Sequence, residues 1–398
     1  FLSTVLEGRE IEGPLALVGG GAASRGLVRA FTEALDFEDA QLIRLDDHLF
    51  VCALGAALLA DTEFRLDEWI EETERSLESG TKSEVRPESS KAIALPPLEE
   101  PSVKPTVETS SPSPESADAV TSSIRGYLGI DVGSVSTNVV FLSETFELLE
   151  QVYVATRGRP VEALDEALGV IESRFGDRIE VLAVGATGSG RHLAARLLGA
   201  DLVKNEITAQ LVSAAHIVPE VDTIFEIGGQ DSKFIDARGG VLRDFEMNKI
   251  CAAGTGSFLE EQAERLGVTI KGEFTELALE AIAPRDLGSR CTVFMDTELV
   301  RAQQMGTSIE DICAGLAYSI ARNYLEKVVA NRPVGETVVF QGGTASNEAV
   351  VSAMRALTGS SIVVHPYNRI SGAIGAALLA ARDYSRAPGP SAFRGTQA

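Results

Sequence analysis

The stretch GIDVGSVST, from Gly129 to Thr137, ends an apolar strand at the carboxylate of Asp131 and continues into a tight turn. Gly133 and Ser134 in the turn are small enough to let backbone N–H groups approach a phosphate closely, and Thr137 lies just beyond it. A carboxylate at this point faces the Mg²⁺ ion that accompanies a nucleotide. The stretch therefore predicts a phosphate-binding turn, although a single turn of this kind is more often an ordinary hairpin.

The same design recurs twice further along the chain. EIGGQDSKFI, residues 226–235, places Gly228–Gly229, Gln230 and Asp231 between two strands. FQGGTASNEA, residues 340–349, places a glycine turn at the start of a helix, where an adenosine can rest against the backbone. The residues predicted to line the adenosine side are Gly342, Gly343 and Asn347. Three such turns in this order predict a nucleotide site.

Composition excludes several classes of partner and site. The chain carries 58 acidic and 35 basic residues, and this excess argues against binding to nucleic acid or to an anionic membrane surface. No apolar run reaches about 18 residues, so no membrane-spanning helix is expected. Four cysteines in 398 residues make no disulfide framework and favour a reducing, cytoplasmic setting.

An internal repeat indicates the domain organisation. LALVGGGAASRGLVRAF (15–31) matches VVFQGGTASNEAVVSAM (338–354), and ALGAALLA (53–60) matches AIGAALLA (373–380) in the same order. Residues 1–76 are therefore predicted to be the C-terminal part of a first, truncated copy of the second domain, and the opening residues to be the interior of a longer protein. Residues 77–125, rich in Ser, Pro, Glu and Thr, are predicted to be a disordered linker. A complete domain at 126–385 and a tail at 386–398 follow.

The complete domain is predicted to be mixed α/β, with first strands that pair in antiparallel orientation. Strands are expected around the turn at 131–134, at 180–185, and as a strand–turn–strand at 223–236. Helices are expected at 160–175, 206–218, 255–266 and 296–304.

The three turns together resemble the actin/Hsp70/sugar-kinase ATPase superfamily. Within it, ATGSGR, NEITAQ, EIGGQDSK, NKICAAGTGSFLE, RCTVFMDTEL and VFQGGTASN are similar to the BadF/BadG/BcrA/BcrD ATPase family over about residues 126–381. The resemblance implies an actin/Hsp70-like (ribonuclease H-like) fold with two halves around a nucleotide cleft. ATP with Mg²⁺ would bind there, Asp131 and Asp231 would hold the ion through water, and Gln230 would orient the attacking water. A hairpin hydrogen bond is the alternative role for Gln230.

The cysteines divide into two pairs. Cys52 and Cys313 lie in apolar helical runs and are predicted to be buried hydrophobes. Cys251 and Cys291 lie among glycines and polar residues before helices, whose N-termini favour a thiolate. From the residues alone, inert structural thiols remain the commoner case. The family resemblance implies instead that each subunit supplies Cys251 and Cys291 to one [4Fe–4S] cluster at a dimer interface.

The resemblance also implies a function. ATP binding and hydrolysis would shift the two halves, and the cluster would deliver low-potential electrons to a 2-hydroxyacyl-CoA dehydratase or a benzoyl-CoA reductase-like partner. Reduced ferredoxin or flavodoxin would be the electron donor. The partner either is a separate protein or lies in the same polypeptide, and the assembly is either a homodimer or a pseudo-dimer of tandem units.

One position departs from the family pattern, and two alternatives stay open. Asn138 stands where relatives often have a lysine, which leaves Lys233 and Lys249 as the nearest motif-associated cations. A small-molecule kinase of the same fold would need an acceptor-side base, for which Asp286 and Asp296 are the candidates. A nucleotide-binding regulatory module without iron is the other alternative.

Overall fold

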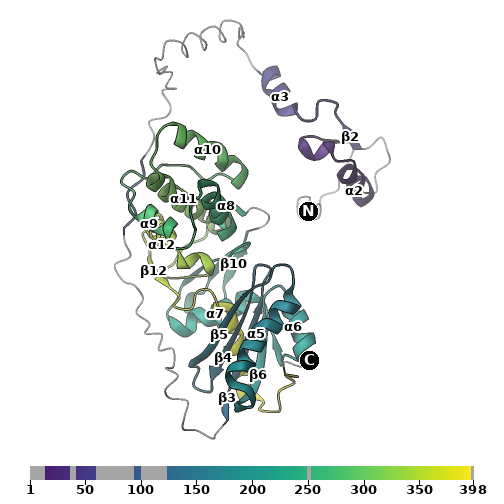
Figure 1. The fold of residues 1–398 in the computed structure, drawn as a ribbon, viewed down its shortest axis with the longest axis vertical. Helices are drawn as coiled ribbons and strands as arrows, with labels where there is room; N and C mark the ends of the chain where they lie inside the picture. The colour runs from purple at the N-terminus through teal and green to yellow at the C-terminus, as the bar shows by residue number, and fades with distance from the viewer. Residues whose placement is uncertain (1–13, 36–41, 60–93, 100–122, 249–251, 396–398) are drawn as a thin grey trace. The chain divides into compact units, whose positions relative to one another are not determined.

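The computed structural model describes residues 14–35, 42–59, 94–99, 123–248 and 252–395 (Figure 1). The chain forms two compact units, Phe1–Lys91 and Ala92–Ala398. Among the described residues, no helix is both long and apolar enough to cross a bilayer.

Unit 1 has the element order of the matching C-terminal repeat. Strands β1 (Leu15–Leu17) and β2 (Leu42–Arg44) pair in parallel. The short helix η1 (Gly20–Ala23) and helices α2 (Arg25–Leu35) and α3 (Val51–Leu59) complete the unit. Gly19 at the turn before η1 has φ 84°, close to the 89° of Gly342 at the equivalent turn of the second copy. The assignment of residues 1–76 to a truncated ATPase domain stays a prediction.

Unit 2 contains two halves, each built on a five-stranded sheet. The sheet of half I has the order β5-β4-β3-β6-β7. Its strands are β3 (Ile124–Val132), β4 (Ser136–Ser143), β5 (Leu148–Ala155), β6 (Ile179–Thr187) and β7 (Leu202–Val203). Its helices are α5 (Pro160–Phe175), α6 (Arg191–Leu198), α7 (Glu206–Ile217) and the C-terminal α13 (Ser371–Arg386).

The sheet of half II has the order β10-β9-β8-β11-β12. Its strands are β8 (Thr223–Ile227), β9 (Ser232–Asp236), β10 (Asp244–Met247), β11 (Thr337–Gln341) and β12 (Ser361–Val364). Its helices are α8 (Gly256–Leu266), α9 (Glu273–Leu279), α10 (Thr292–Gln304), α11 (Ile309–Tyr324) and α12 (Glu348–Thr358).

The two sheets share one topology. In each, the first three strands form an antiparallel meander, and the fourth and fifth join in parallel on the far side of the first strand. Parallel neighbours require crossover connections, and helices supply them here. This duplicated arrangement around a cleft confirms the predicted two-half fold.

Helices α7 and α13 pack against each other, so closely that a Cβ at Gly375 of α13 would lie 1.9 Å from the Ala209 carbonyl oxygen of α7, and each also contacts one sheet. Ile207 and Leu211 of α7 share a hydrophobic core with β8, β9 and β11 of half II. Helix α13 instead joins the core under β3 and β6 of half I. Its approach is so close that a Cβ at Gly129 or Gly185 would lie 2.0 or 2.1 Å from a carbonyl oxygen of the helix. These two glycines therefore allow the helix to cover the sheet.

The structure differs from the predictions made from the sequence, or adds to them, in four places. Helix α10 begins at Thr292, directly after Cys291, rather than at residue 296. Cys52 is exposed, so its predicted burial is wrong, whereas Cys313 is fully buried as predicted. Residues 94–99 depart from the linker predicted at 77–125, because they pack on half II, and β3 already begins at residue 124. In the tail, the backbone N–H of Ala392 donates to Asp201 of half I.

Candidate functional site

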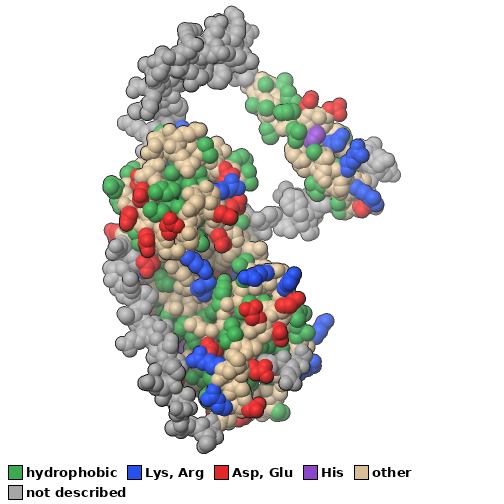
Figure 2. All heavy atoms as spheres, in the orientation of Figure 1, with side chains coloured by type: hydrophobic (Ala, Val, Ile, Leu, Met, Phe, Trp, Pro, Cys, Tyr) green, Lys and Arg blue, Asp and Glu red, His purple; other side chains and the backbone are tan. Residues whose placement is uncertain are grey.

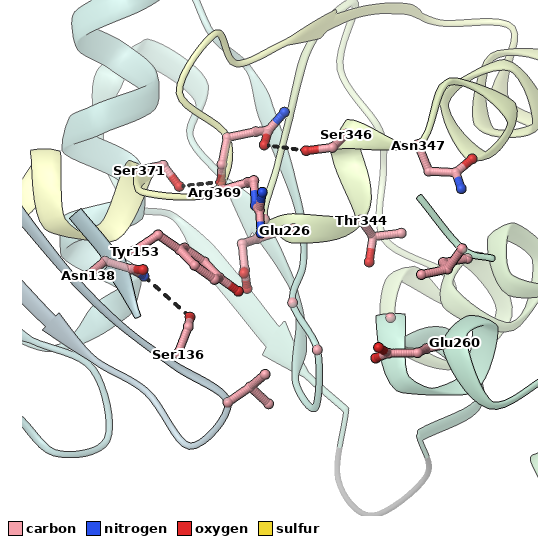
Figure 3. Close-up of a pocket in the computed structure, with 18 of the residues that line it drawn as sticks. Ser136, Asn138, Tyr153, Glu226, Glu260, Thr344, Ser346, Asn347, Arg369 and Ser371 are labelled. Atoms are coloured by element: carbon pink, nitrogen blue, oxygen red, sulfur yellow. Dashed lines mark hydrogen bonds between the residues drawn. The ribbon is translucent and has the colours of Figure 1, made fainter. Parts of the chain in front are cut away.

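A cleft of about 610 Å³ lies between the two halves of unit 2 (Figure 3). Six of the predicted nucleotide-site residues line it: Asp131, Gly228, Gly229, Gly342, Gly343 and Asn347. The cleft is also lined by polar residues that were not predicted from the sequence to belong to the site. These are Ser136, Tyr153, Gln210, Glu226, Glu260, Lys271, Thr275, Thr344, Ser346, Asn368, Arg369 and Ser371. The three predicted turns therefore converge on one cavity.

Five predicted residues lie outside the lining: Gly133, Ser134, Thr137, Gln230 and Asp231. Thr137 is fully buried and its hydroxyl pairs with that of Thr156 at 3.0 Å. Along β4 successive side chains point to opposite faces, so Ser136 and Asn138 face the cleft and Thr137 faces away. Asp231 is exposed on the β8–β9 turn.

Carboxylates gather at the floor of the cleft. Asp131, at the end of β3, and Glu226, on β8, both line it. Burial, to which the nearby negative charge of Glu206 adds, raises the pKa of Asp131 to about 7. Burial also raises the pKa of Glu226, against the opposing positive charge of Lys233. Two carboxylates that line one cleft are suited to a divalent cation, which would relieve their repulsion.

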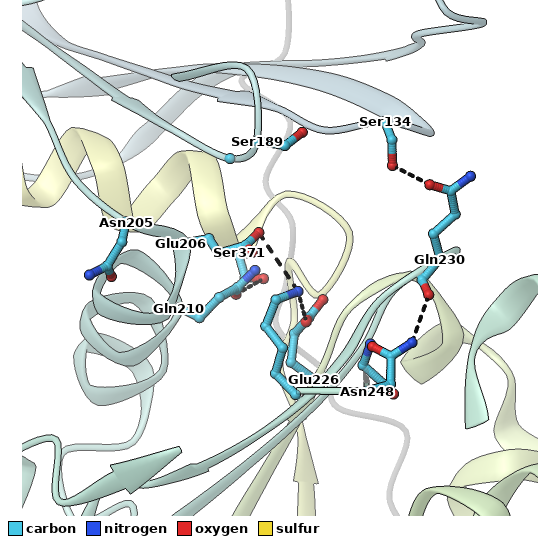
Figure 4. Close-up of polar contacts among 12 residues, drawn as sticks. Ser134, Ser189, Asn205, Glu206, Gln210, Glu226, Gln230, Asn248 and Ser371 are labelled. Carbon is cyan, nitrogen blue, oxygen red and sulfur yellow. Dashed lines mark hydrogen bonds and ion pairs between the residues drawn. The ribbon is translucent and has the colours of Figure 1, made fainter. Parts of the chain in front are cut away.

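Lys233 supplies the balancing positive charge. Its Nζ donates to Glu226 Oε2 at 2.7 Å and lies 3.7 Å from Glu206 Oε2, with the side chain only 4% exposed (Figure 4). Burial alone would lower the pKa of Lys233, but the two glutamates outweigh it and raise the pKa above its ordinary value. The sequence predicts Lys233 only as a nearby cation, and the structure uses it as a buried ion-pair partner.

Two glycines give the Asp131 carboxylate its space. A Cβ at Gly188, in the ATGSGR motif, would lie 2.4 Å from Asp131 Oδ1, and one at Gly372 would lie 2.1 Å from Oδ2. Any larger residue at either position would displace the carboxylate. The motif and the start of α13 thus both fix where this oxygen pair points.

The two turns that the sequence predicts to bind phosphate, one from each half, are joined by a hydrogen bond. Ser134 Oγ, on the β3–β4 turn of half I, donates to Gln230 Oε1, on the β8–β9 turn of half II, at 2.6 Å (Figure 4). Gln230 is exposed, and its carboxamide oxygen faces Ser134 rather than the cavity. The turn residues therefore form a bridge between the halves.

The second phosphate turn is also bonded to the chain on either side of Cys251. The backbone N–H groups of Gly256 and Ser257, at the start of α8, donate to the carbonyls of Gly228 and Gly229, both at 2.8 Å. On the other side, Asn248 Nδ2 donates to the Gln230 carbonyl at 3.1 Å. Cys251 itself lies outside the described residues, and the residues that flank it at 248 and 256–257 are fixed to the turn.

Comparison with known proteins identifies the family. Residues 128–380 match the model of the BadF/BadG/BcrA/BcrD ATPase family. The chain belongs to this family. That membership makes it an ATPase, as the sequence predicted.

Several relatives of this ATPase have names that state a function. It is 35% identical over 258 residues to the (R)-2-hydroxyglutaryl-CoA dehydratase activating ATPase of Acidaminococcus fermentans, covering 64% of this chain and 96% of the relative. It is 36% identical over 266 residues to the activator of lactoyl-CoA dehydratase of Anaerotignum propionicum, again covering 64% and 96%. The crystal structure of component A of the Acidaminococcus fermentans dehydratase is similar with a TM-score of 0.59 at 31% identity, covering 65% of this chain and 98% of that one.

Further polar groups from both halves line the cleft. They include Glu260 on α8, Lys271 just before α9 and Thr275 on α9. Arg369 stacks on the Tyr153 ring, with its Cζ 4.3 Å from the ring centroid, and both residues line the cleft. No motif in the sequence marked these residues, because they come from four separate elements.

Asn138 has an unusual environment in this ATPase. The residue is 4% exposed and lines the cleft, and its amide nitrogen lies 3.4 Å from Ser136 Oγ. Its Oδ1 has no hydrogen-bond partner among the residues that the structure describes. A buried amide oxygen without a partner is rare in folded proteins.

Cys291 is the one described member of the predicted cluster pair. It is half-buried and occupies the N-cap position of α10, where its side chain makes no capping hydrogen bond. Helix α10 is linked to α8 by an ion pair between Asp296 and Arg265. Within the described ranges no group of three or more His, Cys, Asp or Glu residues is arranged around a single metal position.

The two acids considered as kinase bases are engaged elsewhere. Asp286 Oδ1 accepts from Arg322 at 2.7 Å, and Asp296 pairs with Arg265. Neither lines the cleft. The cleft therefore gives the kinase alternative no support from these residues.

Proposed function

We propose that this ATPase is an activator that couples ATP hydrolysis to the delivery of low-potential electrons to an acyl-CoA dehydratase or reductase. The named relatives support the activator role, since they are activators of 2-hydroxyacyl-CoA dehydratases, and a further relative is one of the subunits of the benzoyl-CoA reductase of Thauera aromatica. A solved relative, the activator of 2-hydroxyisocaproyl-CoA dehydratase from Clostridium difficile, has bound ADPNP.

In the proposed site, ATP lies in the cleft between the halves. Gly229 offers its backbone N–H group to the phosphates, whereas the N–H of Gly228 already donates to the Asp231 carbonyl at 2.9 Å. Gly342, Gly343 and Asn347 contact the adenosine side. Asp131, with Glu226 beside it, faces Mg²⁺, which retains most of its water ligands. Gln230 as the residue that orients water and Asp231 as a second Mg²⁺ partner stay predictions, as do contacts to phosphate from Gly133, Ser134 and Thr137.

The observation that carries the proposal is the attachment of the Gly228–Gly229 turn to the start of α8. A phosphate bound at this turn acts on the same peptide units that accept hydrogen bonds from Gly256 and Ser257. A shift of the turn would therefore move the N-terminus of α8 and the segment that contains Cys251. The Arg265–Asp296 ion pair extends this connection to α10, which begins beside Cys291.

Two considerations favour a shared cluster. Cys291 is half-buried at the N-cap of α10, and the unpaired N–H groups of a helix start favour negative charge. Two thiols per chain suffice for one cluster when a two-fold axis relates the chains. When bound, a [4Fe–4S] cluster would supply transfer of a single electron.

Anaerobic purification followed by iron, sulfide and ATPase assays tests the proposal. We expect about four irons and four sulfides per pair of domains for a shared cluster. Cys251→Ser and Cys291→Ser should each lose the iron and keep MgATP hydrolysis. Cys52→Ser is the matched control, because Cys52 is exposed in unit 1 and should leave the iron content unchanged. An iron-free wild type that phosphorylates a small acceptor would favour the kinase, and an iron-free protein without turnover the regulatory module.

A further inference from the structure

Residues 94–99, with the sequence ALPPLE, pack against half II although they lie upstream of the family-matched region (Figure 1). Leu95 and Leu98 are 8% and 5% exposed and belong to the hydrophobic core of half II. The intervening Pro96 and Pro97 are exposed. The alternation of buried and exposed positions shows that the segment binds half II through a defined face.

Backbone hydrogen bonds hold the segment in register. The Leu95 N–H donates to the Pro284 carbonyl at 2.9 Å, and Ala94 forms an antiparallel bridge with Arg285. The hydroxyl of Tyr318, a buried residue of α11, donates to the Pro96 carbonyl at 2.9 Å. Burial raises the pKa of this phenol, which agrees with a hydroxyl sheltered from water.

The segment at 283–290, which these residues contact, leads directly to Cys291. Its other side is fixed to α11. Ser319 Oγ donates to the Gly288 carbonyl at 2.7 Å, and Asn323 Nδ2 donates to the Arg290 carbonyl at 3.2 Å. At Gly315 a Cβ would lie 2.2 Å from the Arg285 carbonyl oxygen, so the approach to the helix depends on a glycine.

We propose that residues 94–99 are an intrachain clasp that stabilises the 283–291 segment, and with it Cys291 and the start of α10. The clasp supplies a β-bridge, a backbone hydrogen bond and two buried leucine side chains, and it is itself bonded to Tyr318 of α11. The proposal does not depend on ATP or iron, because every contact that carries it lies outside the nucleotide cleft.

The surface formed by 283–288 and α11 is thus a binding site for an extended, leucine- and proline-containing segment of the same chain.

Hydrogen exchange of the full chain, followed by mass spectrometry, tests the clasp. In the Leu95→Ser/Leu98→Ser variant we expect amides of 283–291 to exchange about tenfold faster than in the wild type, with no change in β3 or β6. Leu193→Ser is the matched control, since Leu193 is an exposed leucine on α6. A synthetic peptide of residues 90–103 should restore slow exchange in the double variant, and the same peptide with both leucines changed to serine should not.

Unchanged exchange of 283–291 in the double variant would overturn the clasp. If the double variant instead exchanges rapidly throughout unit 2, Tyr318→Phe decides, because it removes only the hydrogen bond to Pro96. Faster exchange confined to 94–99 and 283–291 in Tyr318→Phe supports the clasp. No change there refutes it.

Discussion

The hydroxyl of Ser134 donates to the carboxamide oxygen of Gln230 at 2.6 Å and thereby joins the phosphate turns of the two halves. One partner lies in half I and the other in half II, so this bond forms only when the turns are close. Gln230 is in turn bonded through its carbonyl to Asn248, three residues before Cys251. The bridge therefore connects the β3–β4 turn of half I to the segment that precedes Cys251.

Ser134→Ala and Gln230→Ala should slow ATP hydrolysis with little effect on nucleotide binding. A hydrogen bond of this kind contributes about 1 kcal/mol, which corresponds to about a fivefold change in the population of the closed cleft. Because neither side chain lines the cavity, the dissociation constant for MgATP should change by less than about threefold. Steady-state hydrolysis and equilibrium titration measure the two quantities.

The double variant provides the control for this bridge. If the two side chains act through one shared bond, combining the substitutions should add nothing to either single effect. Fully additive effects, or a loss of binding above tenfold, would show that the residues contact the nucleotide separately.

The effects of substituting Glu226 and Lys233 on the free energy of unfolding should be strongly coupled. Glu226→Gln leaves a buried lysine without its closest counter-charge, and breaking a buried pair in this way costs about 3–5 kcal/mol of unfolding free energy. Lys233→Met should cost a similar amount. The double variant should recover most of the loss, as measured by urea denaturation. Additive losses in the double variant would contradict the pairing.

His365 should make stability depend on pH below neutrality. Its Nδ1 accepts from the Tyr367 N–H at 3.0 Å and its Nε2 lies 3.1 Å from Ser213 Oγ, so the buried ring is held in its neutral form. Burial lowers the pKa of His365 to about 4, below the value near 6.5 of an unfolded histidine. Between these values the unfolded chain binds more protons, so stability present above pH 6.5 is lost as the pH falls toward 4.

The expected contribution of His365 is at most about 3 kcal/mol. The difference in unfolding free energy between wild type and His365→Gln should therefore change with pH across this window. His192→Gln, at an exposed histidine of α6, is the control and should follow the wild type. A difference that stays constant from pH 7 to pH 4 would show that His365 titrates normally.

The sequence was sufficient for the fold and for the glycine turns, because strand–turn patterns and the internal repeat are local signals. It did not indicate Glu226 and Glu206 as partners of Asp131, since that cluster exists only when β3, α7 and β8 meet. Thr137 shows the limit of a motif, because strand alternation turns it away from the cleft that Ser136 and Asn138 face. Residues 94–99 could not be told from a linker, because proline- and glutamate-rich surroundings hide their two buried leucines.

Hydrogen exchange of residues 252–266 in two nucleotide states tests the central coupling most directly. Amides at the start of α8 should exchange at different rates with a non-hydrolysable MgATP analogue and with MgADP, because Gly256 and Ser257 donate to the Gly228–Gly229 turn, which we propose contacts the phosphates. Helix α5, which does not line the cleft, should exchange equally in both states. Identical exchange across 252–266 in both states, with nucleotide shown to be bound, would contradict the proposed link between ATP and the cysteine-bearing segment.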